Sequence, residues 1–267
     1  MTHLADSGTH DLENNLTNPE AVTSKPFNQY GDRFNPTDHG HGVDIASQRQ
    51  DELDAASLDH IRAAAEIGRR VKALDLGGGY GTHSVRMAEA GAVVTMVDVE
   101  DMASSAFARA IIEKSMPPNA LRFIQRNFDH LEDHEIPKDI DVLYSQRAIH
   151  YVPYLTAETL LRRISNRMAR GGMVYISAAG FDTEYGQTYP DRYKPVEARF
   201  NFVTPEMQEK HAIFHKITTY TENDMASLLR AAGFNIIQIT HSAFGNIKAI
   251  AIKHSTEGRY VSREPTP

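Results

Sequence analysis

The amino-acid sequence predicts an α/β fold, in which a mostly parallel β-sheet carries helices on both faces and ends in an antiparallel hairpin. Short apolar segments rich in β-branched residues alternate with helical patterns over residues 71–180, and such alternation is typical of a covered parallel sheet. The last two apolar segments are separated only by the turn-prone Phe244-Gly245-Asn246, which favours a hairpin. A chain of 267 residues that is 41% hydrophobic is long enough for one large domain of this class.

The first elements follow from their residue spacing. A helix is predicted over 50–70, because apolar residues recur at helical spacing and acidic residues precede arginines. The segment VKALDL at 71–76 then has the apolar character of a short buried strand. A helix from Thr82 to Ala90, closed by Gly91, separates it from a second strand, AVVTMVDV, at 92–99.

Strands and helices continue to alternate in the second half of the chain. The predicted elements are a strand at 121–125, a strand at 139–145, a helix over 156–170 that ends at Gly171-Gly172, a strand at 172–180, a helix from Thr221 to Gly233 and the hairpin FNIIQITHS and NIKAIAIKH. Thr221 and Asp224 approximate a capping box for the last helix. Residues 181–215 interrupt the alternation with many Tyr, Phe and His residues.

Composition divides the chain into four parts. Residues 1–25, rich in Asn, Thr, Asp and Ser, are predicted to form a mobile arm. Residues 26–49 mix aromatic residues with Gly, Pro and His, and are expected to form a lid segment. The main domain is expected over 50–254, with an insertion at 181–215, and residues 255–267 form a tail.

Composition also excludes several classes of protein. The chain has no cysteine, which rules out disulfides, thiolate metal sites and a cysteine nucleophile. A formal net charge of −7 argues against a general nucleic-acid binder. No apolar run approaches the roughly 20 residues of a membrane span, and the polar start does not resemble a signal peptide. We therefore expect a soluble cytoplasmic protein, whose oligomeric state the sequence does not give.

A glycine-rich segment, LGGGYG at 76–81, stands between the first strand and the next helix. Glycines let a ligand approach the backbone, and a helix N-terminus offers unpaired N–H groups. The dinucleotide pattern Gly-x-Gly-x-x-Gly fails, because residue 82 is threonine. The pattern that fits is Asp75-x-Gly77-x-Gly79-x-Gly81; the alternative is a tight turn without a ligand.

The second strand ends in Asp98. An acid at this place can accept hydrogen bonds from both ribose hydroxyls of a nucleoside ligand. An adenosine ligand without a diphosphate needs this acceptor but no phosphate cradle. The alternative is that Asp98 only caps the following helix.

These two features resemble the first motif of the class I S-adenosylmethionine-dependent methyltransferase family, and the resemblance covers about residues 71–180. It implies a seven-stranded, Rossmann-like sheet, methyltransferase activity and S-adenosylmethionine as the cofactor. The cofactor-binding residues that it implies in this part of the chain are Asp75, Gly77, Gly78, Gly79, Gly81, Asp98 and Val99.

Two later segments extend the resemblance. Arg126-Asn127-Phe128 stands where the family often has Gly-Asp-Ala, so Asn127 is expected to accept from the adenine amino group and Phe128 to lie against the ring. The change from Asp to Asn leaves a plain turn residue as the alternative. The segment SQRAIHYVP at 145–153 matches the family's Ser or Asn followed by Leu-His-His/Tyr and Pro, which makes Ser145 a cofactor contact.

His150 is the candidate catalytic residue. The resemblance places it near the methyl group, and the ordinary pKa of histidine suits a general base. The alternatives are a structural role or a substrate contact without proton transfer. Tyr151 is a substrate-contact candidate that alternatively points into the core, because adjacent helix positions diverge.

The lid segment and the insertion supply further candidates. The resemblance implies that Tyr30 and Arg33 reach the methionine carboxylate of the cofactor; ordinary packing is the alternative. The insertion offers an aromatic wall and cationic corners for a small carboxylated or aromatic acceptor, unless it only packs on the sheet edge. Its candidates are Tyr185, Tyr189, Arg192, Tyr193, Arg199 and His211.

No metal site is expected. His39 and His41 form a His-x-His pair, and His211 and His215 are spaced i, i+4. The metalloprotease pattern needs Glu after the first histidine, where Ala212 stands, and no third ligand follows.

We therefore expect a methyltransferase that acts on an oxygen or nitrogen of a small-molecule acceptor, without nucleic-acid or membrane partners. One alternative is an RNA or protein methyltransferase on the same fold. The other is a non-catalytic module that binds S-adenosylmethionine.

Overall fold

The computed structural model describes residues 31–100, 116–117 and 119–254. The predicted arm and the tail lie outside the described residues, so both stay predictions. The chain divides into two units, residues 1–34 and 35–267, and every element below belongs to the second unit. No helix in these described ranges is long and apolar enough to cross a membrane.

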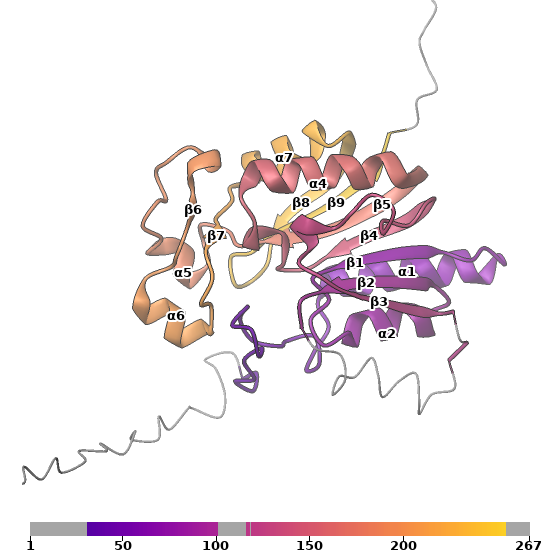
Figure 1. Ribbon diagram of the computed structural model, residues 1–267, viewed down its shortest axis with the longest axis horizontal. Helices are drawn as coiled ribbons and strands as arrows, with labels where there is room; N and C mark the ends of the chain where they lie inside the picture. The colour runs from indigo at the N-terminus through magenta and orange to yellow at the C-terminus, as the bar shows by residue number, and fades with distance from the viewer. Residues whose placement is uncertain (1–30, 101–115, 118, 255–267) are drawn as a thin grey trace, which may run out of the picture. The chain divides into compact units, whose positions relative to one another are not determined.

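The second unit is built on a seven-stranded sheet with the order β3-β2-β1-β4-β5-β9-β8, drawn in Figure 1. The first five strands in this order are parallel, and β9 is antiparallel to both of its neighbours. The strands are β1 (Lys72–Leu76), β2 (Val93–Asp98), β3 (Leu121–Gln125), β4 (Ile140–Ser145), β5 (Met168–Ala178), β8 (Phe234–His241) and β9 (Ile247–Lys253). The predicted sheet and its closing hairpin are confirmed. The strand order reverses between β1 and β4, which is where ligands bind in sheets of this class.

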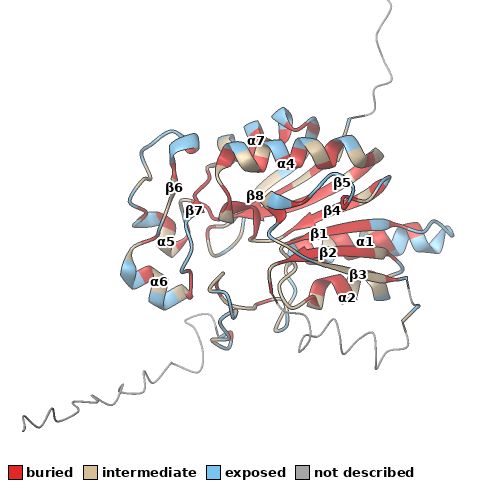
Figure 2. Ribbon diagram, in the orientation of Figure 1, coloured by how far each residue is buried: buried red, intermediate tan, exposed pale blue. Residues whose placement is uncertain are grey.

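Among the described residues, the helices α1 (Glu52–Glu66) and α2 (Thr82–Glu89) lie on one face of the sheet. Their apolar side chains share a buried cluster with strand residues such as Ala73 and Val94. Burial is concentrated in the strands and on the inner sides of the helices, as Figure 2 shows. The strands are therefore buried on both faces, as is typical of a parallel sheet covered by helices.

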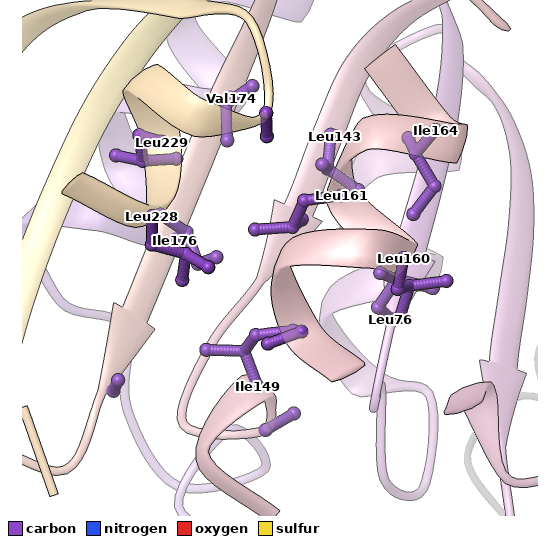
Figure 3. Close-up of a cluster of buried hydrophobic side chains, with 14 of the residues drawn as sticks. Leu76, Leu143, Ile149, Leu160, Leu161, Ile164, Val174, Ile176, Leu228 and Leu229 are labelled. Atoms are coloured by element: carbon purple, nitrogen blue, oxygen red, sulfur yellow. The ribbon is translucent and has the colours of Figure 1, made fainter. Parts of the chain in front are cut away.

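The other face is covered by α4 (Tyr154–Arg167) and α7 (Glu222–Ala231). Figure 3 shows the side chains of both helices packed against the strands. The labelled residues are Leu160, Leu161 and Ile164 of α4, Leu228 and Leu229 of α7, and Leu76, Leu143, Ile149, Val174 and Ile176 from the sheet and the turn after β4.

Helix boundaries show where sequence signals held and where one failed. The capping box of Thr221 and Asp224 starts α7 as predicted, and Asp51 with Asp54 forms a second box at α1. The prediction that the helix over 156–170 ends at Gly171-Gly172 was wrong. The chain turns extended at Met168 (ψ 147°), and both glycines lie inside β5.

The insertion forms a small layer that follows directly from the end of β5. It contains α5 (Glu184–Gln187), β6 (Phe200–Asn201) and α6 (Pro205–His211), and β6 pairs with β7 (Ile217–Thr218), which follows the insertion. Its buried cluster, which includes Tyr189, is separate from the two clusters of the main sheet. These elements gather at one end of the sheet in Figure 1.

Candidate functional site

A cavity of about 850 Å³ lies at the carboxyl ends of β1, β2 and β4. We call its wall from β1, β2 and the turn after β3 the glycine side. We call its wall from residues 146–216 the insertion side, and residues 35–46, which also contribute to the wall, the strap. The volume is in the range of small-molecule sites.

The glycine side is shaped by a loop that only glycine can form. Gly77, Gly79 and Gly81 all have left-handed backbones, with φ of 71°, 56° and 79°. A Cβ on Gly77 would lie 2.2 Å from the Cβ of Ala148, whereas a Cβ on Gly79 would meet no atom within 4 Å. Gly77 is therefore required by both conformation and close packing, and Gly79 leaves open space for a ligand against the backbone.

Asp98 joins the glycine loop to the end of β2. Its carboxylate accepts hydrogen bonds from the N–H of Gly79 at 2.8 Å and from the N–H of Glu100 at 2.9 Å. Burial raises its pKa to about 6. A carboxylate has about four acceptor sites, so acceptor capacity remains for a hydroxyl group in the cavity.

Asp75 presents an unused acceptor to the cavity. It is 1% exposed, and its Oδ2 accepts from Ser84 Oγ at 2.6 Å. Its Oδ1 is buried and has no partner among the described residues, and burial raises its pKa to about 7. An unsatisfied buried carboxylate oxygen suits a cationic donor such as an ammonium group.

Asn127, Phe128 and Val99 complete the glycine side. Phe128 is buried at the start of a short 3-10 helix (Phe128–His130), while Asn127 is exposed at the cap of that helix. The glycine side therefore combines a ring surface, a backbone without side chains and two carboxylates. This set fits S-adenosylmethionine, which carries an adenine ring, a ribose and an ammonium group.

His150 lies at the junction of the two sides, on a 3-10 helix (Ile149–Tyr151). It is 2% exposed, and its Nδ1 faces the N–H of Ala179 at 3.3 Å. Nδ1 is the acceptor in this bond, so the ring proton stays on Nε2. Burial and the charge of Arg147 lower the pKa of His150 to about 3. The ring is therefore neutral at pH 7 and is a donor through Nε2.

The strap is hydrogen-bonded both to the insertion and to the residues directly after β2. Gly42 donates to the carbonyl of Ala212 at 2.8 Å, and Phe214 donates to the carbonyl of Gly40 at 2.9 Å. At the other end, His39 Nδ1 lies 2.8 Å from the carboxylate of Glu100. The strap therefore ties the insertion to the strand that carries Asp98.

Histidine and tyrosine rings line the insertion side. His41 of the strap stacks on His215 at 4.1 Å and meets Tyr151 edge-on at 4.8 Å. Burial lowers the pKa of His41 to about 4. Tyr185 and His211 contact each other at 5.2 Å, and both line the cavity. Among the described residues, no group of three or more His, Cys, Asp or Glu side chains is arranged to hold a metal ion.

Comparison with known proteins identifies the family. A family model described as a methyltransferase domain matches residues 45–239. The chain belongs to this family. Because the glycine side also fits the cofactor, the protein is an S-adenosylmethionine-dependent methyltransferase, as the sequence predicted. A search of curated proteins gave no match.

Solved methyltransferase structures share the fold. An S-adenosylmethionine-dependent methyltransferase from Mesorhizobium loti is 19% identical, with a TM-score of 0.54 over 75% of this chain and 100% of that chain. Magnesium protoporphyrin IX methyltransferase from Synechocystis, crystallised with bound S-adenosylhomocysteine, is 16% identical, with a TM-score of 0.51 over 75% and 83%. An O-methyltransferase family protein from Burkholderia thailandensis is 18% identical, with a TM-score of 0.51 over 77% of this chain but only 57% of that one.

The methyltransferase cavity includes most of the predicted cofactor residues. Asp75, Gly77, Gly78, Gly79, Asp98, Val99, Asn127 and Phe128 all line it. Gly81 and Ser145 do not. Gly81 is buried at the cap of α2, and Ser145 Oγ donates to the carbonyl of Leu76 at 3.0 Å, between β4 and β1. Tyr30 lies outside the described residues, and Arg33 belongs to the first unit, so both stay predictions.

Four of the seven predicted acceptor residues do not line the cavity of the methyltransferase. Tyr151, Tyr185 and His211 do, but Tyr189, Arg192 and Arg199 are used inside the insertion. The Tyr189 hydroxyl bonds to the carbonyls of Asn201 and Ile217. The Arg192 guanidinium donates to the backbone carbonyl of Phe181. The Arg199 guanidinium pairs with the carboxylate of Asp224. Tyr193 is 95% exposed.

Sequence reasoning missed the strap histidines and Arg147 as cavity residues. The density of His and Gly in DHGHGVD at 38–44 was the only available signal for the strap. No sequence pattern marks Arg147 as a cavity residue, because the position of its side chain depends on the backbone conformation of the turn after β4.

Proposed function

We propose that this methyltransferase transfers a methyl group to an oxygen or nitrogen of a small-molecule acceptor. The observation that carries the proposal is the aromatic insertion side of the cavity. There the strap is hydrogen-bonded across the insertion, and aromatic rings such as Tyr151, Tyr185 and Phe200 line the wall. A concave aromatic wall favours a small planar acceptor over a folded RNA or protein surface.

The residues of the chain have distinct tasks in this proposal. Bound S-adenosylmethionine supplies an electrophilic methyl group on its sulfonium. Asp98 accepts from the ribose hydroxyls, Asp75 accepts from the ammonium group, and Phe128 lies against the adenine. His150 donates through Nε2 to the acceptor and orients it, which replaces the general base that the sequence suggested. Catalysis then relies on positioning and on the exclusion of water.

Two further features support a small acceptor. The formal net charge of −7 disfavours a polyanionic acceptor such as RNA. One structural neighbour, magnesium protoporphyrin IX methyltransferase, is named for a small planar molecule.

Calorimetry tests the cofactor site first. Wild-type protein is titrated with S-adenosylmethionine, S-adenosylhomocysteine and, as a control, NAD; we expect micromolar binding of the first two only. Asp98→Asn should weaken S-adenosylhomocysteine binding by about 1.5–3 kcal/mol, the range for hydrogen bonds to a charged group. Equal affinity in a folded variant would mean that the ribose is held elsewhere.

An acceptor screen then tests the reaction. Production of S-adenosylhomocysteine is followed with small phenols, amines and aromatic acids, and in parallel with total tRNA and cell protein. Turnover with a small molecule supports the proposal. Turnover only with RNA or protein, or tight cofactor binding without any turnover, would overturn it in favour of the alternatives.

A further inference from the structure

The charged residues of the glycine side and the insertion side differ in sign, and the strap between them adds one acid, Asp44. The described residues of the glycine side include Asp75, Asp98, Glu100 and Asp129, and include no lysine or arginine. The described residues of the insertion side include Arg147 and Lys216, and include no aspartate or glutamate. Such an arrangement raises the local concentration of cationic groups on one side and of anionic groups on the other.

Arg147 is held in an unusual backbone conformation at this wall. Its φ is 53°, in the left-handed region that residues other than glycine rarely adopt. Its N–H lies 2.9 Å from Ser177 Oγ and 3.2 Å from the Ser177 carbonyl, which fixes the turn to β5. Residues in this region cluster at functional sites, although Asp139 and Ala212 adopt it elsewhere in the described chain.

The guanidinium of Arg147 has no hydrogen-bond or ion-pair partner within the described part of the chain. Arg192 and Arg199 contrast with it, since both are bonded to carbonyl or carboxylate oxygens. Arg147 is partly buried, and its charge acts on the neighbouring His150 by lowering the pKa of that ring. The charge of Arg147 also acts on the carboxylate of Asp54, but no described carboxylate is bonded to the guanidinium, so its donors are available to a ligand anion.

We propose that Arg147 binds a carboxylate of the acceptor, and that the acceptor is a small aromatic acid. This inference rests on the proposed function and adds the acceptor class. The guanidinium fork matches a carboxylate with two parallel hydrogen bonds. Tyr151, Tyr185 and Phe200 provide ring surfaces for the aromatic part. Arg147 is thus the residue that selects acids among planar acceptors.

The test compares each acid with its own amide on protein saturated with S-adenosylhomocysteine. The probes are salicylate against salicylamide and indole-3-carboxylate against indole-3-carboxamide, and affinity is measured by calorimetry. We expect at least one acid to bind about tenfold or more tightly than its amide, as a charge-assisted pair implies. In Arg147→Asn this preference should disappear, because asparagine tolerates the left-handed backbone but carries no charge.

Two controls make the outcome specific. Lys216→Gln removes the other cation of the insertion side, whose Nζ lies 5.7 Å from the Phe202 ring, and should leave the acid preference intact. Affinity of Arg147→Asn for S-adenosylhomocysteine should stay within about twofold of wild type.

The inference is overturned if no acid binds better than its amide, or if the preference survives in Arg147→Asn. It is also overturned if Arg147→Asn loses S-adenosylhomocysteine, which would assign the guanidinium to the cofactor carboxylate. Failure of the wild type to bind S-adenosylhomocysteine would instead reject the proposed function.

Discussion

The two sides of the cavity are built in different ways. The glycine side comes from strand ends and the turns directly after them, and its polar contacts join neighbouring elements, such as Asp98 with the N–H of Gly79, 19 residues apart. The insertion side depends on contacts between distant segments, such as His215 Nε2 with the carbonyl of His39 at 2.6 Å, 176 residues apart. Backbone geometry therefore determines the glycine side, and tertiary packing determines the insertion side.

Substrate specificity can change on the insertion side more readily than cofactor binding can change on the glycine side. A backbone loop that needs glycine admits few substitutions, so cofactor binding is tied to the fold. The insertion side is made of side chains on a strap and a small separate layer, which can vary without disturbing the seven-stranded sheet. The comparison predicts large effects at the glycine loop and smaller effects towards the strap.

The largest effect is expected for Gly77→Ala. Its left-handed backbone costs about 1–2 kcal/mol for a residue with a Cβ, and the contact 2.2 Å from the Ala148 Cβ adds about 1–3 kcal/mol of overpacking. Urea denaturation should therefore show about 2–5 kcal/mol of destabilisation, and calorimetry a large loss of S-adenosylhomocysteine affinity.

Gly79→Ala is the matched control for this substitution. It has the same backbone requirement but open space at the Cβ, so only the first cost of about 1–2 kcal/mol applies. Adding Ala148→Gly to Gly77→Ala should recover part of the loss by relieving the contact. Equal destabilisation by both single substitutions would show that close packing at Gly77 is unimportant.

The same contrast explains what the sequence could predict. The pattern Asp75-x-Gly77-x-Gly79-x-Gly81, the acid at the end of β2 and the alternation of elements are local, and they were enough for the fold, the family and most of the glycine side. The end of α4 was missed by three residues, because Met168 turns extended before the glycines that mark a helix end. Boundaries depend on tertiary pairing, here of β5 with β4.

The insertion side was predicted by residue type alone, and the structure brings three of its candidates, Tyr151, Tyr185 and His211, to the cavity wall. Tyrosine and arginine suit an acceptor pocket, but they suit the inside of a small layer equally well. Tyr189 and Arg199 satisfy buried carbonyls and a carboxylate in the insertion, a need that appears only once the chain is folded. Arg147 and His41 were missed for the converse reason, since distant segments bring them to the wall.

A medium effect is expected from His150, which lies between the two sides. Its folded pKa of about 3 lies below the ordinary value of 6.5, so its charged form is disfavoured in the folded state. Its contribution to stability is fully present above about pH 6.5 and is lost as the pH falls towards about 3. At pH 5.5 the loss is about 1.4 kcal/mol, the value of one pKa unit.

Urea denaturation of wild type and His150→Asn at pH 7.5 and pH 5.5 measures this loss. The stability difference between the two proteins should shrink by about 1.4 kcal/mol at the lower pH. ¹⁵N spectra of histidine-labelled protein should independently show a neutral ring protonated on Nε2 across this range. A ring that gains its second proton near pH 6.5 would restore the general-base reading.

The smallest effect is expected at the strap, where His39 meets Glu100. The hydrogen bond that the ring donates to this carboxylate raises the pKa of His39, so the charged ring is favoured in the folded state. The contribution is therefore present below about pH 6.5 and is lost as the pH rises through the raised pKa. The His39 side chain is half exposed, so the pair contributes at most about 1 kcal/mol.

Hydrogen exchange of the strap amides, corrected for intrinsic rates, should be faster at pH 8.5 than at pH 6 in wild type, and fast at both in His39→Asn. Gly42→Pro removes the N–H that is bonded to the carbonyl of Ala212. If Gly42→Pro accelerates the exchange of the strap amides but His39→Asn leaves it unchanged, the strap is held by the insertion alone. The two sides would then be energetically independent, and changes in acceptor binding would not reach Asp98 through Glu100.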